Sequence, residues 1–454
     1  MAKRILTLCL ALVIGIAFAM PAGAAVKSIK VGGDLTIRGI YRDNLDFIGT
    51  DIDKNQAWAM TATRIWVGAE LTDNVSAVIR LINEKDWGNS IIQTAAGAAG
   101  IVGLPLNTSQ SVDIDLAYIK MKDLFFPGFT ATLGRQEILL GKGFVVGNAN
   151  GLAAAATANT AIRAADLTTR KAFDAWKLDL EAGTVPLTFT LFDAKILEEN
   201  ASVWQTQLGL APLFTGIDAN LMGLNVAYKL DNATIEGYVL DLNARKANVD
   251  IFTYGLRVDH NVLAMPGFNY NLEAALQNGD LTAAISQNAW AGNADISYTF
   301  QNPMQPKIGG SWFYATGNKA GGTKNEGWLN LFADNLGDRV GRLTLASAAQ
   351  NVISLPFLGM NNSIPKVYAS IKPAEKHALS LAYFPASTVV VKPGTTSNVI
   401  GWELDFGYSY QYTEDVSFGL CVDFAEAGKM LKQAIGAGFD SNATQVIGSV
   451  AVSF

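Results

Sequence analysis

Three arginines, Arg38, Arg64 and Arg80, occur in stretches where polar and apolar residues alternate, and each has an isoleucine next to it. In an extended strand, successive side chains point to opposite faces, so each arginine would share a face with polar residues and the isoleucines would lie on the other face. A row of guanidinium groups on a polar face can bind anions or pair with carboxylates. The spacing therefore predicts a basic stripe across three consecutive strands.

Further charged residues continue this polar face in later stretches. They are Asp113, Asp115, Lys177, Asp179, Arg257, Asp259 and Glu273. One hypothesis is that these groups create a transverse field that orients and filters polar solutes. The alternative is that they pair with one another and stiffen the sheet. Arg135 is a separate candidate whose direction is ambiguous. Leu133, two residues before it, is expected to face outward, so Arg135 would point inward only if a β-bulge near Gly134 rotated the strand.

The elements that would position these residues are eighteen amphipathic segments, each roughly as long as the nine to eleven residues of a tilted membrane strand. They begin near Lys30, Ala57, Val75, Ser111, Gly128, Ala172, Leu187, Asn220, Ala233, Ile251, Gly267, Asn288, Gln305, Lys366, Lys376, Ile400, Asp415 and Thr444. In several of them acidic residues stand directly between large aromatic residues. A sheet that was buried on both faces would not tolerate this arrangement.

The connections between these segments alternate between short and long. Short ones such as 71–74 and 230–232 carry the residues of tight turns, whereas 136–171 and 316–365 are long. Outer-membrane barrels have short periplasmic turns and longer outer loops. The sequence therefore predicts an all-β fold, an 18-stranded antiparallel transmembrane β-barrel with both termini on the periplasmic side. Proline is expected only in the connections or at strand ends.

The last segment, 444–454, is expected to close the barrel by pairing with the segment near Lys30. It alternates an apolar face with a mostly small or polar one, and it ends on Phe454. In a secreted bacterial chain, an aromatic carboxyl terminus on such a strand resembles the signal read by the barrel-insertion machinery. Phe454 is therefore the predicted recognition point for that partner.

Residues 1–24 are predicted to be a secretory signal peptide, and residues 25–454 a single barrel domain. A basic start at Lys3 and Arg4 precedes a short apolar run and then small residues. Removing the peptide would leave Cys421 as the only cysteine, so neither an internal disulfide nor a cysteine-based metal site is expected. The number of basic residues would fall from 34 to 32 against 40 acidic residues. This balance argues against nucleic acid as a partner.

Five stretches have distinctive sequences. They read GRQEILLGKGFVVG from Gly134, RKAFDAWKL from Arg170, YATGNK from Tyr314, LFADNLGDRVGR from Leu331 and GWELDFGYSYQYTEDVSFGL from Gly401. Together they resemble the alginate-export type of outer-membrane porin. The resemblance implies an eighteen-stranded barrel that is usually monomeric, in the outer membrane of a Gram-negative-type bacterium. It also gives weight to Arg135, which matches the family motif.

The sequence departs from the pattern of that family at three positions. Leu140, Phe144 and Ala175 stand where the family usually has Tyr, Arg and Gly. Two polar groups near the pore are therefore missing from this chain.

The connection 136–171 could narrow the pore. Its alanine and leucine residues favour a short helix, and inward folding would place Arg163 and Asp166 at a constriction. The alternative is a solvated outer loop. Trp66 shares the phase of Arg64, so it is expected to face the lumen, either as part of a sugar-binding surface or packed against its neighbours.

The connection 316–365 could cap the mouth of the barrel. Its Asp334 and Asp338 carry oxygen ligands of the kind that Ca²⁺ prefers, but their spacing is not diagnostic of a calcium site. No metal ion and no cofactor is expected.

A catalytic role is not expected. The only histidines, His260 and His377, lie at short connections, and no nucleophile–base pattern or phosphate loop is present. Two hypotheses remain. The first is a channel for polar or anionic small solutes or oligosaccharides, surrounded by outer-membrane lipid and lipopolysaccharide. The second is a structural barrel that docks or sheathes another exported component.

Overall fold

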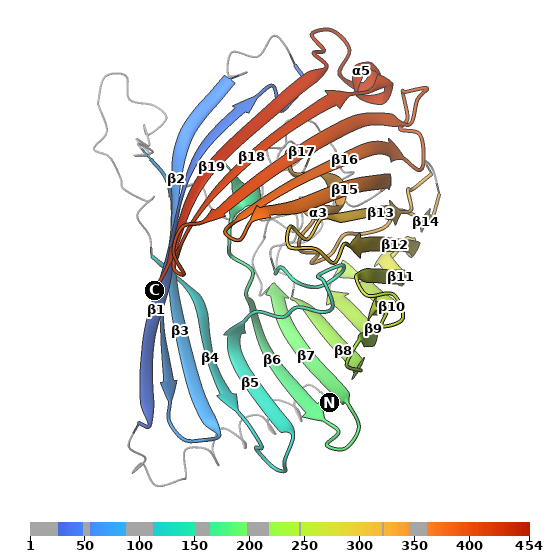
Figure 1. Cartoon of the computed structure of the whole chain (residues 1–454). Helices are drawn as coiled ribbons and strands as arrows, with labels where there is room; N and C mark the ends of the chain where they lie inside the picture. The colour runs from blue at the N-terminus through green and yellow to red at the C-terminus, as the bar shows by residue number, and fades with distance from the viewer. Residues whose placement is uncertain are drawn as a thin grey trace, which may run out of the picture.

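The computed structural model describes residues 26–48, 55–87, 112–149, 164–197, 218–244, 247–319, 322–344 and 361–454. Eighteen long strands in this part of the chain form one closed antiparallel barrel (Figure 1). They are β1 (Ser28–Asp43), β2 (Asn55–Glu70), β3 (Val75–Asp86), β4 (Asp113–Met121), β5 (Phe129–Gln136), β6 (Phe173–Glu181), β7 (Leu187–Leu197), β8 (Ala219–Lys229), β9 (Ala233–Ala244), β10 (Val249–Asn261), β11 (Phe268–Thr282), β12 (Ile285–Thr299), β13 (Lys307–Ala315), β15 (Asn362–Ala374), β16 (His377–Thr388), β17 (Val399–Gln411), β18 (Val416–Ala427) and β19 (Asn442–Ser453).

Four short elements lie in the connections. They are the 3-10 turn η3 (Ala165–Leu167), the two-residue strand β14 (Lys324–Asn325), and the helices α3 (Gly337–Val340) and α5 (Lys429–Ile435). None of the helices in the described residues is long and apolar enough to cross a membrane.

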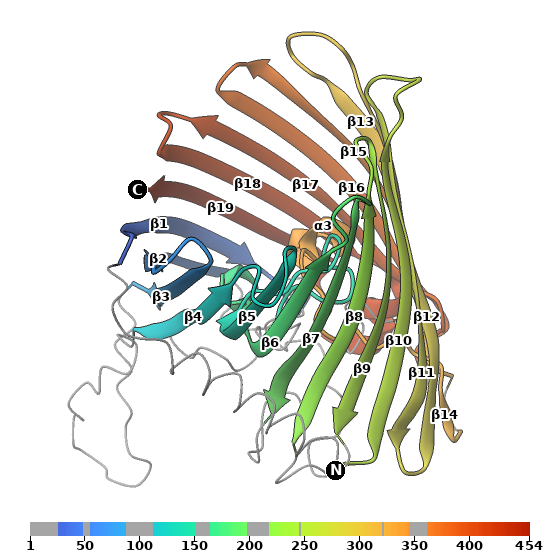
Figure 2. The same ribbon diagram turned by 90° about the horizontal axis from the view of Figure 1, so that it is seen from below.

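The seam between β1 and β19 closes the barrel, as the sequence predicts. The two strands pair in antiparallel register from Asp34 opposite Ser453 to Asp43 opposite Thr444. The N–H group of Phe454 donates to the carbonyl of Gly33 at 3.0 Å, and the N–H group of Gly33 donates in return at 2.9 Å. Figure 2 shows the two strands side by side. Every strand of the barrel begins within four residues of its predicted start.

The two faces of the wall differ in character, and β10 illustrates the difference. Phe252, Tyr254 and Leu256 are exposed on its outer face, whereas Ile251 and Thr253 are fully buried on the inner face. Large hydrophobic side chains are exposed in the same way on most of the other strands. An apolar outer belt of this kind is the surface that a lipid bilayer covers in a membrane barrel.

One expectation about proline is wrong. Pro365 lies inside β15 and Pro385 lies inside β16, whereas Pro373 is the last residue but one of β15 and so lies at a strand end as expected. Proline has no N–H group to donate, so it interrupts a ladder. The register between β15 and β16 breaks off after Ser363 and resumes at Val367, and Pro365 and Pro385 face each other across this gap.

Candidate functional site in the lumen

The described parts of two long connections fold into the barrel. The first inward loop joins β5 to β6 and is described at residues 137–149 and 164–172. The second inward loop joins β13 to β15 and is described at residues 316–319, 322–344 and 361. Helix α3 of the second loop lies inside the ring of strands in both views (Figures 1 and 2). The prediction that the first loop folds inward is confirmed for its described residues, 137–149 and 164–172. Arg163 and most of the alanine-rich segment lie outside the described residues.

The two loops bind each other through their backbones. Phe332 donates its N–H to the carbonyl of Val145 at 3.1 Å and accepts from Gly147 and Asn148 at 2.9 Å. Asp334 donates to Gly143 at 2.8 Å. The side chains add a salt bridge of 2.8 Å between Lys171 and Asp334. The two loops therefore form one folded body in the lumen.

A glycine permits this close approach. Gly143 has a φ of +71°, in the left-handed region, and a Cβ atom there would lie 2.8 Å from Cβ of Asp334. Residues with side chains rarely adopt this conformation.

One side of this body is apolar and packs against the barrel wall. Phe144 lies 6.2 Å from Trp328 and from Phe313, measured between ring centroids. Phe173 lies 5.7 Å from Phe332. These residues belong to a buried cluster that includes side chains from β6 to β13. Leu140 and Phe144, two of the three departures from the pattern that the resemblance implied, are both in this cluster, so apolar packing stands where polar side chains were expected.

The first loop is anchored to β1, β3 and β4 by charged side chains, of which Arg42, Asp166 and Glu84 are buried. Arg42 forms a bidentate pair with Asp166, with distances of 2.6 and 3.0 Å. Glu84 accepts from the hydroxyl of Thr168 and the N–H of Thr169, both at 2.7 Å. Arg170 lies 3.2 Å from Glu84 and 2.9 Å from Asp113.

The second loop is anchored on the other side of the seam, to β17 and β18. Arg342 donates to Asp423 at 3.2 Å from Nε and to the carbonyl of Phe406 at 2.9 Å. The N–H groups of Leu343 and Thr344 donate to Glu403 at 2.7 and 2.8 Å.

Arg342 keeps its positive charge at this anchor. Burial would lower the pKa of Arg342, but the hydrogen bond to Asp423 and the charges of Asp405 and Asp423 outweigh burial and raise it.

The predicted basic stripe faces the lumen, but two of its three members are paired. Arg64 lies 2.9 Å from Asp34. Arg80 lies 2.6 Å from Asp115 and also binds Glu137. Within the described part of the chain, Nη1 of Arg38 is buried and has no hydrogen-bond partner.

The later candidates are paired as well. Lys177 lies 2.8 Å from Asp179. Arg257 binds Glu236 and lies 2.5 Å from Asp259. Glu273 accepts from the hydroxyl of Tyr238 at 2.9 Å. The lumen is therefore lined by charges of both signs in short-range contact.

The expectation that Arg135 lines the pore is wrong. β5 pairs with β4 and β6 without a register shift, so no bulge rotates the strand. Arg135 lies opposite Asp174 and pairs with it at 2.9 Å. The following residue, Gln136, points to the inner face and is buried opposite Phe173. Arg135 therefore stays on the outer face together with Leu133.

Trp66 faces the lumen as predicted. It lies opposite Gly32 in register, and a Cβ atom on Gly32 would lie 2.6 Å from its ring. The indole ring therefore lies flat on the inner wall, where the missing side chain leaves room for it.

The two candidate calcium ligands, Asp334 and Asp338, do not form a cluster. The carboxylate of Asp334 pairs with Lys171 instead. Among the described residues, no group of three or more acidic, histidine or cysteine side chains is placed to hold a metal ion.

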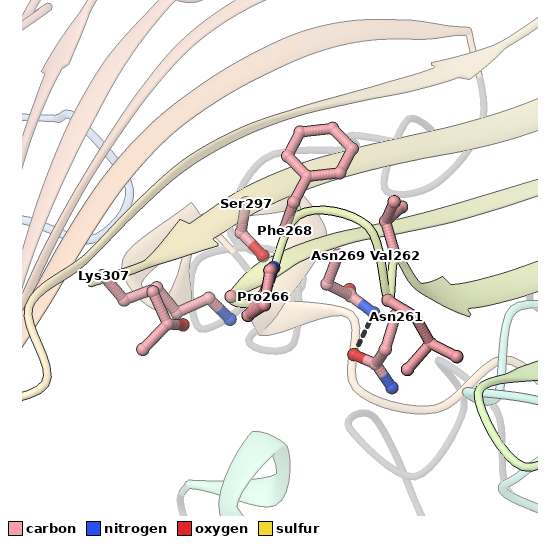
Figure 3. Close-up of a pocket in the computed structure, with 10 residues that line it drawn as sticks. Asn261, Val262, Pro266, Phe268, Asn269, Ser297 and Lys307 are labelled. Carbon is pink, nitrogen blue, oxygen red and sulfur yellow. Dashed lines mark hydrogen bonds between the residues drawn. The ribbon is translucent and has the colours of Figure 1, made fainter. Parts of the chain in front are cut away.

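A small cavity of about 390 Å³ lies near the turn between β10 and β11 (Figure 3). Asn269 donates to Asn261 at 3.0 Å on one side of it, and Lys307 lies on the other. Lys307 is the one charged residue in its lining, and its ammonium group lies 5.5 Å from the ring of Tyr368. The cavity is a feature of the short-turn end, away from the two loops.

Several residues of the lumen site were missed from the sequence. Arg42 could have been predicted, because it continues the inward phase of Arg38 on the same strand. Arg342 and Arg339 could not, because they lie in a loop without any periodic pattern. Arg339 donates to the carbonyl groups of Lys142 and Asp334, both at 2.9 Å, and holds the two loops together.

A closed eighteen-stranded barrel with a charged lumen and two inward loops has the architecture of an outer-membrane channel. The chain belongs to the alginate export family, whose sequence profile matches residues 27–384.

Solved structures from Pseudomonas aeruginosa share this fold. OccK5 (OpdH) is 13% identical with a TM-score of 0.56, over 94% of this chain and 98% of that one. OpdO is 11% identical with a TM-score of 0.58, over 95% and 98%. The outer membrane protein OpdK is 10% identical with a TM-score of 0.55, over 94% and 98%. A comparison with curated proteins finds no match.

Proposed function

We propose that this protein is a channel in the outer membrane of a Gram-negative-type bacterium, and that it passes small polar solutes, including anions and oligosaccharides. The short-turn end would face the periplasm, which agrees with the side expected for both termini in this class. The chain would act as a monomer, since one chain closes its own barrel.

The observation that carries the proposal is the distribution of charge around the two loops. The loops pack their apolar side against the wall from β6 to β13. Arg38, Arg64 and Arg80 lie on the inner face of β1 to β3, and the side chains of Arg64 and Arg80 remain partly exposed. A solute would therefore meet guanidinium groups beside carboxylates, which suits polar and anionic molecules.

Planar-bilayer recording tests the proposal. Purified protein is expected to conduct, and reversal potentials in a salt gradient should shift away from anions when Arg38, Arg64 and Arg80 are replaced together by alanine. Arg135→Ala is the control, because it removes one guanidinium group from the outer face instead of three from the inner face. A shift of equal size in the control would contradict the assignment of the stripe.

The second candidate is a structural barrel that docks or sheathes another exported component. The mutual binding of the two loops favours it, because a lumen that they close completely would not conduct. A silent barrel in bilayers, correctly folded by heat-modifiability on a gel, would favour this candidate over the channel.

Phe454 is proposed to be the contact for the insertion machinery, and the apolar outer belt the surface for lipid and lipopolysaccharide. The exposed ring of Phe454 at the end of the seam supports the first of these assignments.

A further inference from the structure

A continuous chain of bonded side chains, buried except at the partly exposed Arg342, crosses the seam of the barrel and joins the two inward loops. It runs from Asp166 through Arg42, Gln445 and Asp423 to Arg342. Arg42 donates from Nε to Oε1 of Gln445 at 2.7 Å. Gln445 donates from Nε2 to Asp423 at 2.9 Å. Asp166 and Arg342 belong to the first and second loops respectively, and the three central residues belong to β1, β19 and β18.

The register of the strands creates this chain. Gln445 lies directly opposite Arg42 on one side and directly opposite Asp423 on the other. The three side chains share the inner face of the wall, and Gln445 is 1% exposed and Asp423 0%. Hydrogen bonds in such a low-dielectric place are strong when they are satisfied and costly when they are broken.

The amide of Gln445 is suited to this position in one orientation only. Its oxygen must face the guanidinium group of Arg42, because that group only donates, and its NH₂ must face the carboxylate of Asp423, because that group only accepts. A change that loosens the bond on one side reorients the amide and weakens the bond on the other. Gln445 therefore lies between one anchor of each loop, bonded to Arg42 on one side and to Asp423 on the other.

We propose that Gln445 is a positioning residue that couples the two inward loops across the seam, so that both loops set the constriction together. The inference rests on the proposed channel function for its consequence, but the coupling itself can be measured without conductance. It also implies that the constriction is completed only when β19 pairs with β1, since the connecting amide arrives with the last strand.

A double-mutant cycle tests this coupling. Asp166→Asn weakens the anchor of the first loop and Arg342→Gln weakens that of the second. The two changes are made singly and together, in the wild-type protein and in Gln445→Leu. The first readout is the rate at which a charged methanethiosulfonate reagent modifies Cys421, which shares the inner face of β18 with Asp423. The second is the frequency of current transitions in single-channel records.

In the protein with Gln445 intact, the change in the Cys421 modification rate in the double variant should differ about tenfold from the product of the changes in the two single variants. That is a typical size for residues in one network. In the Gln445→Leu background, the change in rate in the double variant should equal the product of the changes caused by Asp166→Asn and Arg342→Gln. An unchanged departure from the product in Gln445→Leu would overturn the proposal. A merely structural role for Gln445 would lower the unfolding midpoint without altering this departure.

Two further variants sharpen the test. Gln445→Glu retains the volume and the acceptor for Arg42 but sets a carboxylate against Asp423, so it should also uncouple the loops, and it serves if Gln445→Leu does not fold. Wild-type coupling in Gln445→Glu would overturn the proposal.

Gln277→Leu is the matched control, because the amide of Gln277 is also buried, but it bonds to Leu329 of the second loop, twice at 2.9 Å, and to Gln287 of β12 at 3.2 Å. It should preserve the coupling. A loss as large as in Gln445→Leu would mean general loosening and would overturn the proposal. If the protein carries no current in bilayers, only the proposed channel function is contradicted. The modification rates of Cys421 still measure the coupling between the loops.

Discussion

The guanidinium group of Arg42 and the carboxylate of Asp166 form a bidentate pair in which the two side chains are 1% and 4% exposed. Breaking a buried pair by removing one partner typically costs about 3–5 kcal/mol, because the other charge stays buried. Arg42→Met should therefore lower the free energy of unfolding by about that amount, measured by urea titration in detergent micelles. Arg42→Met with Asp166→Leu should recover much of the loss, and a double variant less stable than the single one would contradict this account.

Gly143→Ala should loosen the contact between the two loops. The new Cβ atom would lie 2.8 Å from Cβ of Asp334, in a left-handed conformation that costs a residue with a side chain about 1–3 kcal/mol. Gly183→Ala is the control, since Gly183 also has a positive φ, but a Cβ atom added there would have nothing within 4 Å. Gly143→Ala should increase the Cys421 modification rate and Gly183→Ala should not. Equal effects would mean that backbone strain alone is responsible.

Phe144→Arg should separate the loops by electrostatic repulsion. The guanidinium carbon of Arg339 lies 5.4 Å from the centre of the Phe144 ring, so the new cation would stand beside an existing one in an apolar cluster. We expect a higher single-channel conductance. Phe144→Leu keeps the site apolar and should keep the conductance near that of the wild type. If both variants conduct alike, the packing of the ring rather than the charge controls the opening.

Cys421 provides a direct view of the lumen. It faces inward between Gly419 and Asp423 on β18, and it is partly exposed. A cationic methanethiosulfonate reagent should reduce the current irreversibly, because it leaves a bulky charged group on the inner wall. Cys421→Ser should be insensitive to the same reagent. A current that persists after complete modification, measured by mass spectrometry, would place the conducting path away from β18.

The strands could be predicted because alternation is a local property of the sequence. Side chains on β10 alternate between the outer face and the lumen, so the period of two is visible without any tertiary information. The inward direction of Arg38, Arg64 and Arg80 follows from the same period. The family motif is a poorer guide to the direction of Arg135 than the phase of Leu133, which places both residues on the outer face.

The site between the loops could not be predicted in this way. The bonds of Arg342 to Asp423 and of Arg339 to Lys142 join segments far apart in the sequence, and no period relates them. The sequence shows Phe144 only as the loss of a polar group, because its stacking on Trp328 depends on how the second loop folds over the first. Such contacts are fixed by tertiary packing, which overrides local preference.

The opposed prolines of β15 and β16 have a mechanical consequence. The seam between β1 and β19 is held by ten consecutive residue pairs, whereas the β15–β16 ladder is interrupted between Ser363 and Val367. Under lateral tension on the wall, β15 and β16 should therefore part before β1 and β19 do. The place where the chain closes on itself is then the stronger of these two junctions.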